Sequence, residues 1–116
     1  MAQTVDWYYH RLGWVTCGKT QEFLAQKGIT AKTLVDARKE RFGPDATLKL
    51  TQEVSEVIAA KGKKVVRINL AKDKPSPDDL LAVLMGPSGN LRAPTLRKGK
   101  KLLVGFDPTS YTEVLG

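Results

Sequence analysis

Apolar and polar side chains alternate over several short stretches of the chain, and this alternation predicts β-strands. Residues 5–10, VDWYYH, are rich in β-branched and aromatic side chains, and residues 29–37, ITAKTLVDA, form a second such run. Near the C-terminus, residues 91–96 and 101–106 predict two more strands. The Lys98-Gly99 pair between them is typical of a hairpin turn.

The segment between the first two strands predicts a crossover helix. Thr16 can cap this helix, Cys17 falls in its first turn, and Gly28 suits the left-handed residue that ends many helices. Because a helical crossover connects parallel strands, the strands at 5–10 and 29–37 are expected to be parallel.

Two further helices are expected in the C-terminal half. Ser76 and Pro77, followed by two aspartates, form a typical helix start, because acidic side chains suit the positive end of a helix. This helix is expected to end at Gly86. A last helix is predicted from Pro108 through Leu115.

The middle of the chain has two interpretations. The apolar residues between 48 and 58 fit one long helix, whereas the alternation over residues 66–70 is a strand pattern. We favour a short helix at about 45–54, followed by a β-hairpin that turns around Lys61-Gly62.

The order of these elements is βαβ, a middle region, a helix, a β-hairpin and a helix. This order predicts an α/β, thioredoxin-like fold of the glutaredoxin type, with a mixed four- to five-stranded sheet and helices on both faces. The chain of 116 residues has neither internal repeats nor a linker, so residues 1–116 are expected to form a single domain.

Composition indicates in which cellular compartment the protein is expected and which bound groups it can hold. The longest apolar runs are too short to span a bilayer, and the N-terminus lacks a basic start followed by an apolar stretch, so we expect neither membrane association nor export. The single cysteine cannot form an internal disulfide, and the reducing cytoplasm is the expected location. With one histidine and one cysteine, the chain predicts no metal site, and no cofactor is expected.

The net charge of +7 permits an acidic partner. The basic residues are spread over several turns, however, and no aromatic side chains are interleaved with them. This distribution favours an ordinary lysine-rich surface over a nucleic-acid interface.

Two motifs resemble the arsenate reductase (ArsC)/Spx branch of the thioredoxin superfamily. The first is YYHRLGWVTCGKTQEFLAQKGI, which is similar to a strand, a Cys-x-x-Cys or Cys-x-x-Ser loop and a helix ending in Gly-Ile. The second is LRAPTLRKGKKLLVGFDPTSYTEVL, which is similar to the Arg-Pro segment, hairpin and closing helix of this branch. The motifs cover about the first 30 and the last 40 residues, and residues 37–75 match poorly. The chain looks most similar to the subgroup known as ArsC family (seleno)proteins.

The resemblance assigns the catalytic positions to Trp14 and Cys17. The register set by Tyr9 and by Gly28-Ile29 places Trp14 on the nucleophile of the family and Cys17 on the resolving position. A thiolate is stabilised at a helix N-terminus, but an indole has no ionisable thiol and cannot attack a disulfide. The chain as written is therefore expected to be inactive as a dithiol enzyme.

Two explanations for Trp14 are open. The first is a degenerate, non-catalytic relative in which tryptophan is the natural residue. The second is a native selenocysteine, because its UGA codon lies one base from the UGG codon of tryptophan and can be misread as tryptophan; a deliberate substitution would give the same sequence. The resemblance to a selenoprotein subgroup favours the second explanation.

Pro94 and Arg92 are the substrate-binding residues that the resemblance implies. Pro94 aligns with the cis-proline of thioredoxin folds, beside the active-site loop. Arsenate reductases carry arginine directly before this proline, where the present chain has Ala93. Neighbouring strand residues point to opposite faces, so Arg92 cannot simply replace the missing arginine, and arsenate is a doubtful substrate.

Four other residues are weaker candidates for the functional site or have a structural alternative. Arg38 and Lys39 follow the second strand, where they would line the same end of the sheet or form a solvated turn. Arg67 is a guess for a mid-chain arginine of the family, and His10 is expected at the sheet edge. Cys17 also fits a small buried apolar residue.

The leading hypothesis is a thiol- or selenol-disulfide oxidoreductase-like protein of the ArsC family. The resemblance implies an oxidised thiol, a disulfide or a small oxyanion as substrate, with glutathione or thioredoxin as candidate partners. The alternative is a non-catalytic, Spx-like binding module for an acidic protein or nucleic-acid partner.

Overall fold

The structure is a computed structural model that describes residues 3–11, 15–61, 64–86 and 89–115. It contains eight strands and five helices within these ranges. The strands are β1 (Gln3–Val5), β2 (Trp7–His10), β3 (Ile29–Ala31), β4 (Leu34–Asp36), β5 (Glu56–Lys61), β6 (Lys64–Asn69), β7 (Thr95–Lys98) and β8 (Lys101–Val104). The helices are α1 (Val15–Lys27), α2 (Pro44–Thr51), α3 (Leu70–Asp73), α4 (Pro77–Leu84) and α5 (Pro108–Leu115).

The main sheet is mixed and has six strands in the order β4-β2-β7-β8-β5-β6. β2 is parallel to β4, and β8 is parallel to β5, whereas the other neighbours are antiparallel. The prediction of four to five strands was therefore wrong. The sheet is larger because the β5–β6 hairpin pairs with β8 and extends the same sheet.

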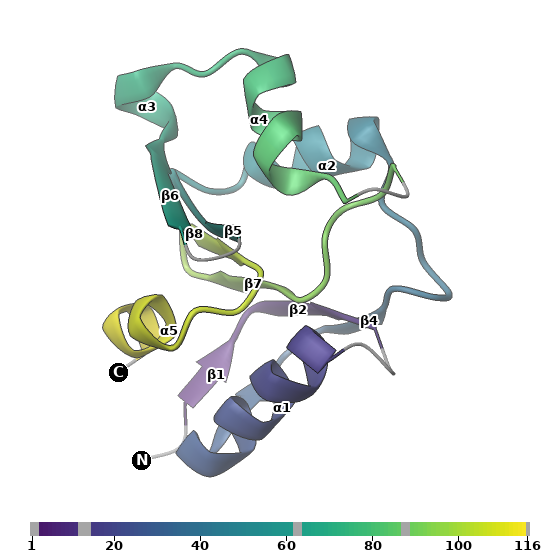
Figure 1. Cartoon of the computed structure of the whole chain (residues 1–116), viewed down its shortest axis with the longest axis vertical. Coiled ribbons are helices and arrows are strands. Elements are labelled where there is room, and N and C mark those ends of the chain that lie inside the picture. The colour runs from purple at the N-terminus through teal and green to yellow at the C-terminus, as the bar shows by residue number, and fades with distance from the viewer. Residues whose placement is uncertain (1–2, 12–14, 62–63, 87–88, 116) are drawn as a thin grey trace.

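Helices cover both faces of the sheet, as predicted (Figure 1). On one face, Leu24 of α1 and Tyr111 of α5 pack with Tyr8 and Leu103 of the sheet. The core on the other face contains residues of α2, α4 and alternate sheet positions, namely Leu50, Leu80, Leu84, Tyr9, Val57 and Leu102. Alternation along each strand thus fills two apolar layers, which fits a thioredoxin-like α/β plan.

The first two predicted strands are interrupted in the structure. β1 pairs with β3, and β2 pairs with β4, so the predicted parallel arrangement is confirmed in two short pieces. The break falls at Asp6, whose carboxylate accepts the Gly99 N–H at 2.7 Å and lies 3.6 Å from the Lys32 ammonium. These side-chain contacts favour a bend over a continuous strand.

Two of the four helix ends predicted from capping residues are confirmed, and the other two differ in the structure. Ser76 caps α4, because its hydroxyl accepts the Asp79 N–H at 3.2 Å, and Gly28 adopts φ +68° after α1. The expected cap Thr16 is wrong, since α1 begins at Val15 and Thr16 lies inside its first turn. Helix α4 ends at Leu84, two residues before Gly86.

The middle region contains the favoured short helix and hairpin. Helix α2 covers Pro44–Thr51, and β5 pairs with β6 from Glu56↔Asn69 to Lys61↔Lys64. The strand ends before Leu70 because the Asn69 side chain accepts the N–H groups of Ala71 and Lys72 and starts α3. In the described parts of the chain, no helix is long and apolar enough to cross a membrane.

Candidate functional site

The candidate site lies at the C-terminal ends of β2 and β4, where α1 begins. Because the two strands are parallel, the residues that follow them meet at one edge of the sheet. Arg11 follows β2, and Arg38 follows β4 by two residues. The segment that precedes β7 reaches the same place, since Leu91 donates its N–H to the Phe42 carbonyl at 2.8 Å.

Cys17 is buried in the first turns of α1. Its side chain is fully inaccessible, and its Sγ accepts the backbone N–H of Arg11 at 3.4 Å. Burial raises the pKa of the Cys17 thiol, and the Arg11 N–H and positive charge only partly oppose this effect. A shielded thiol with a raised pKa is a poor first nucleophile toward a free substrate. It suits a resolving thiol, which attacks a mixed bond already formed beside it, or a small core residue.

Trp14 lies outside the described residues, so the structure gives no relation between its side chain and Cys17. The last described residue before it is Arg11, and the first after it is Val15. The assignment of Trp14 to the nucleophile position therefore stays a prediction from the resemblance.

The cis-proline prediction is confirmed. The Ala93–Pro94 peptide bond is cis, and the Pro94 carbonyl accepts the Gly105 N–H at 2.8 Å. Both Ala93 and Pro94 are buried. β7 begins at Thr95, directly after the proline, whereas the sequence pattern had placed the strand start at Leu91. Proline has no N–H to donate to a sheet, which accounts for the shorter strand.

A pocket of about 370 Å³ opens at this edge of the sheet. Its walls come from the end of β2, from the segment after β4 and from the segment before Pro94. The lining residues are Tyr9, Arg11, Ala37, Arg38, Arg41, Asn90, Leu91 and Ala93. Arg11 joins the pocket to Cys17, since its side chain lines the pocket and its N–H contacts the sulfur.

The pocket is positively charged. Three of its lining residues are arginines and none is acidic. The Arg38 Nε lies 3.8 Å from a carboxylate oxygen of Asp36, but both side chains are partly exposed and such a pair is weak. Guanidinium groups in the lining of a concave site favour the binding of carboxylates and oxyanions. The arrangement can therefore hold an anion close to the buried thiol.

Arg92 does not line this pocket. Leu91 and Ala93 do, whereas Arg92 between them does not. Residues 91–94 precede β7, so the expected alternation of strand side chains does not apply to them. Its Nη1 is buried without a hydrogen-bond partner among the described residues, and burial lowers the pKa of the Arg92 guanidinium. Its predicted role in substrate binding stays untested.

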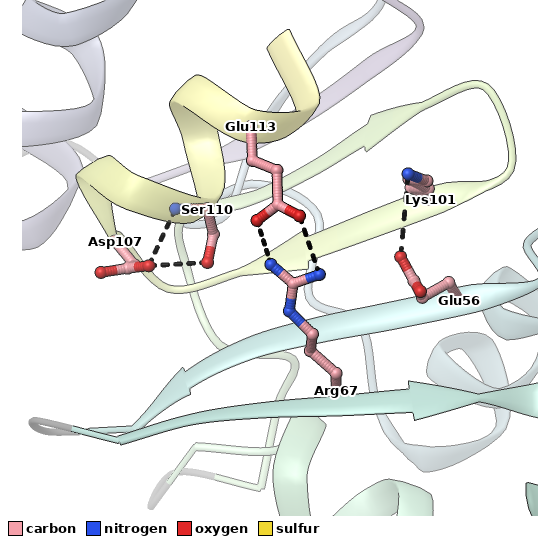
Figure 2. Close-up of polar contacts among 6 residues, drawn as sticks. All are labelled: Glu56, Arg67, Lys101, Asp107, Ser110 and Glu113. Carbon is pink, nitrogen blue, oxygen red and sulfur yellow. Dashed lines mark hydrogen bonds and ion pairs between the residues drawn. The ribbon is translucent and has the colours of Figure 1, made fainter. Parts of the chain in front are cut away.

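Arg67 also lies elsewhere. It belongs to β6 and makes a bidentate ion pair with Glu113 of α5 (Figure 2). The neighbouring contacts in that view, Lys101 with Glu56 and Ser110 with Asp107, join β8 to β5 and start α5. Arg67 is thus part of the contact between the β5–β6 hairpin and α5 and does not line the pocket described above, so its contacts give no support to the guess of a mid-chain site arginine.

The sequence reasoning missed two arginines of the pocket. Arg11 and Arg41 were not singled out, although Arg11 follows the first strand in the same way that Arg38 follows the second. Because parallel strands end at one edge, this equivalence was available from the pattern alone. Arg41 had no such signal, since the fold of residues 37–43 could not be read from the sequence.

His10 is not at the sheet edge, because β2 lies between β4 and β7. It is 8% exposed, and its Nδ1 lies 2.7 Å from the Tyr8 hydroxyl. Its Nε2 is buried with no partner in the described structure, and burial lowers the pKa of the imidazole. Among the residues that the structure describes, no group of three or more potential ligands could hold a metal ion.

No curated protein matches the chain at a significant level. A family model described as ArsC family matches residues 12–114, which is nearly the whole chain and includes Cys17, Arg38, Arg41 and Pro94 but not Arg11. This membership supports a thioredoxin-like redox protein. On the match and the mixed α/β architecture together, the chain belongs to the ArsC family.

Proposed function

We propose that the protein has the active-site plan of a thiol- or selenol-disulfide oxidoreductase, with residue 14 as the attacking position and Cys17 as the resolving position. The observation that carries this proposal is the place of Cys17, a buried thiol at the start of α1 that shares Arg11 with a cationic pocket. As written, with Trp14, the protein lacks the attacking group and is inactive.

The proposed reaction is a two-electron exchange. A thiolate or selenolate at position 14 attacks one sulfur of a substrate disulfide, forms a mixed bond with it and releases the other sulfur as a thiol. Cys17 then attacks the chalcogen at position 14 and releases the second substrate thiol, which takes up the proton of Cys17. The resulting bond between residue 14 and Cys17 is reduced by one thioredoxin dithiol, which becomes a disulfide, or, when the substrate is not glutathione disulfide, by two equivalents of glutathione, which leave as glutathione disulfide.

The arginine pocket supports an anionic substrate. A disulfide with carboxylates, such as glutathione disulfide, or a small oxyanion would meet Arg11, Arg38 and Arg41 beside Cys17. Arsenate has less support, because Ala93 stands where arsenate reductases carry arginine. We place the reaction in the cytoplasm, where a lone thiol stays reduced.

The first test restores the missing nucleophile. The Trp14→Cys variant is expected to reduce glutathione disulfide or insulin, whereas the protein with Trp14 and the double variant Trp14→Cys, Cys17→Ser turn over neither. The measurement is the rate of thiol release in a coupled assay. A Trp14→Cys variant that folds but shows no redox activity would contradict the proposed enzyme function.

The role of the pocket is tested in the same background. Arg41→Glu in Trp14→Cys is expected to raise KM for glutathione disulfide about tenfold and to change kcat much less, because it replaces a positive charge that attracts the substrate with a negative charge that repels it. Lys72→Glu changes the charge equally on α3, away from the pocket, and serves as the control. Equal effects of the two variants would contradict a specific anion pocket.

The origin of Trp14 is a separate part of the proposal. A native Sec-x-x-Cys pair explains why a single cysteine stands at the resolving position of a redox motif. The native codon for residue 14 decides the matter. UGA would support selenocysteine, and UGG would exclude it.

The second candidate function is a non-catalytic binding module. The tryptophan at the nucleophile position and the net charge of +7 favour it. It predicts association with an acidic protein or a nucleic acid that weakens steeply as salt is added. If neither kind of partner binds at low salt, this candidate fails, whereas the redox proposal is unaffected.

A further inference from the structure

β4 forms a free edge of the main sheet. No other strand pairs with its outer side in the described part of the chain. The Thr33 carbonyl and the Ala37 N–H bond to β2, and the alternation of a parallel ladder therefore turns the N–H and C=O of Leu34 outward. Such outward groups are a template for an added strand.

An apolar pocket lies beside this edge. It has a volume of about 320 Å³ and lies between α1 and the β3–β4 segment, with Leu24, Ile29 and Ala31 in its walls and Tyr8 and Leu34 on the sheet. Leu34 is 66% exposed, the highest value among the large hydrophobic residues of the described chain. A strand added along β4 would place alternate side chains toward this pocket.

The charges around the edge favour an acidic occupant. Residues 32–41 carry four exposed basic side chains, Lys32, Arg38, Lys39 and Arg41, against the two carboxylates of Asp36 and Glu40. Lys32 and Arg38 also lie 3.6 and 3.8 Å from Asp6 and Asp36, so the excess of positive charge around the edge is modest. The whole chain carries a net charge of +7. A second copy of the chain would bring like charges together on this edge, whereas an acidic peptide would neutralise them.

We propose that the β4 edge is a docking site for an extended acidic peptide segment of a partner protein. The peptide pairs its backbone with Leu34, and one bulky apolar side chain enters the pocket between α1 and β3–β4. Leu34 and the other residues of the apolar pocket do not line the arginine pocket, although Arg38 lies beside both sites. The proposed site gives the binding-module candidate a definite location on the fold.

The test uses a fluorescein-labelled probe peptide, Glu-Asp-Phe-Glu-Val-Asp, and fluorescence anisotropy. The peptide is expected to bind the protein with Trp14 at low salt. The Leu34→Ser variant is expected to bind it at least about fivefold more weakly, because this variant removes the apolar rim of the pocket. The control is Val65→Ser, which changes another exposed large hydrophobic residue of the described chain, on the opposite edge strand β6, and should leave affinity within about twofold.

Two altered probes separate the parts of the proposal. A peptide N-methylated at alternate residues cannot pair its backbone, and a peptide with Lys at the acidic positions reverses the charge; both are expected to lose binding. Absence of binding by the parent peptide, equal binding by the N-methylated peptide, or equal loss in Leu34→Ser and Val65→Ser would overturn the proposal. So would full competition by oligo(dT), which would indicate a nucleic-acid surface.

The result is distinguishable from failure of the redox function. Leu34→Ser in the Trp14→Cys background is expected to leave turnover of glutathione disulfide unchanged, because Leu34 does not line the arginine pocket. Loss of that turnover would show that the β4 edge is not a separate site and would overturn the proposal as stated.

Discussion

At the scale of single residues, the chemistry of the site depends on how far each group is shielded from water. Cys17 is fully buried and contacts the Arg11 N–H, whereas the arginines of the pocket remain open to solvent on at least one side. Burial disfavours the thiolate, and the nearby positive charge of Arg11 compensates only in part. Cys17 therefore suits the resolving role, in which it attacks a mixed bond that another residue has already formed with the substrate.

The shielding of Cys17 predicts slow alkylation. In the native protein at mildly alkaline pH, iodoacetamide should modify Cys17 at least about tenfold more slowly than it modifies free cysteine, because the thiol must first be exposed by local opening. Mass spectrometry of the intact protein over time gives the rate. In denaturant the rate should rise to that of free cysteine. A native rate equal to the denatured rate would contradict the buried position.

The single histidine predicts how stability depends on pH. The folded-state pKa of His10 is lowered by burial, so the unfolded chain binds its proton at a higher pH than the folded protein does. Stability should therefore fall as pH decreases below the unfolded value of about 6.5, with a slope of at most about 1.4 kcal/mol per pH unit. Asp36, whose negative charge raises the pKa of His10, reduces but does not reverse this effect.

Urea unfolding between about pH 7 and pH 5.5 measures this dependence, in a range where His10 is the only side chain expected to titrate strongly. The His10→Asn variant should show a flatter profile over the same range. A wild-type protein that becomes more stable on acidification would show that the imidazole is stabilised, not penalised, in its charged form.

At the scale of elements, the signals that predicted well were local ones. Gly28 and Ser76 placed helix ends, and the alternation over residues 66–70 was read correctly as far as Asn69. The element boundaries that were predicted wrongly depend on contacts between segments that are distant in the sequence. Asp6 bends the first strand because it bonds to Gly99, a partner 93 positions away that no local pattern reveals.

Gly105 shows such a long-range constraint at the junction of β8 and α5. It adopts φ +77°, and a Cβ placed there would lie 2.8 Å from the Ala60 carbonyl oxygen. Gly105→Ala should therefore destabilise the fold by about 1–3 kcal/mol, from backbone strain and the clash with β5. Chemical denaturation measures the change.

Gly18 provides the matched control. It lies in α1 with no atom within 4 Å of an added Cβ. Gly18→Ala should stabilise the protein by about 0.5–1 kcal/mol, because alanine is the better helix former. Similar effects of the two alanine substitutions would contradict the close approach of β8–α5 to β5.

At the scale of the whole molecule, the sequence predicted the architecture better than the site. The order of elements predicted a mixed sheet with helices on both faces, and the cis bond at Pro94 was expected from the flanking motif. The arginine pocket was not predicted as a unit, because Arg41 reaches it through a segment with no regular structure. The folding of the chain also left β4 as an edge, and no sequence pattern marks a strand as the outermost one.

The central claim is that residue 14 and Cys17 form one redox pair. The most direct measurement is the state of the two positions after the Trp14→Cys variant reacts with one equivalent of glutathione disulfide. We predict that nonreducing peptide mapping will find an intramolecular disulfide between residue 14 and Cys17, with both glutathiones released. A stable glutathione adduct on residue 14, with Cys17 still a free thiol in the folded protein, would contradict the account.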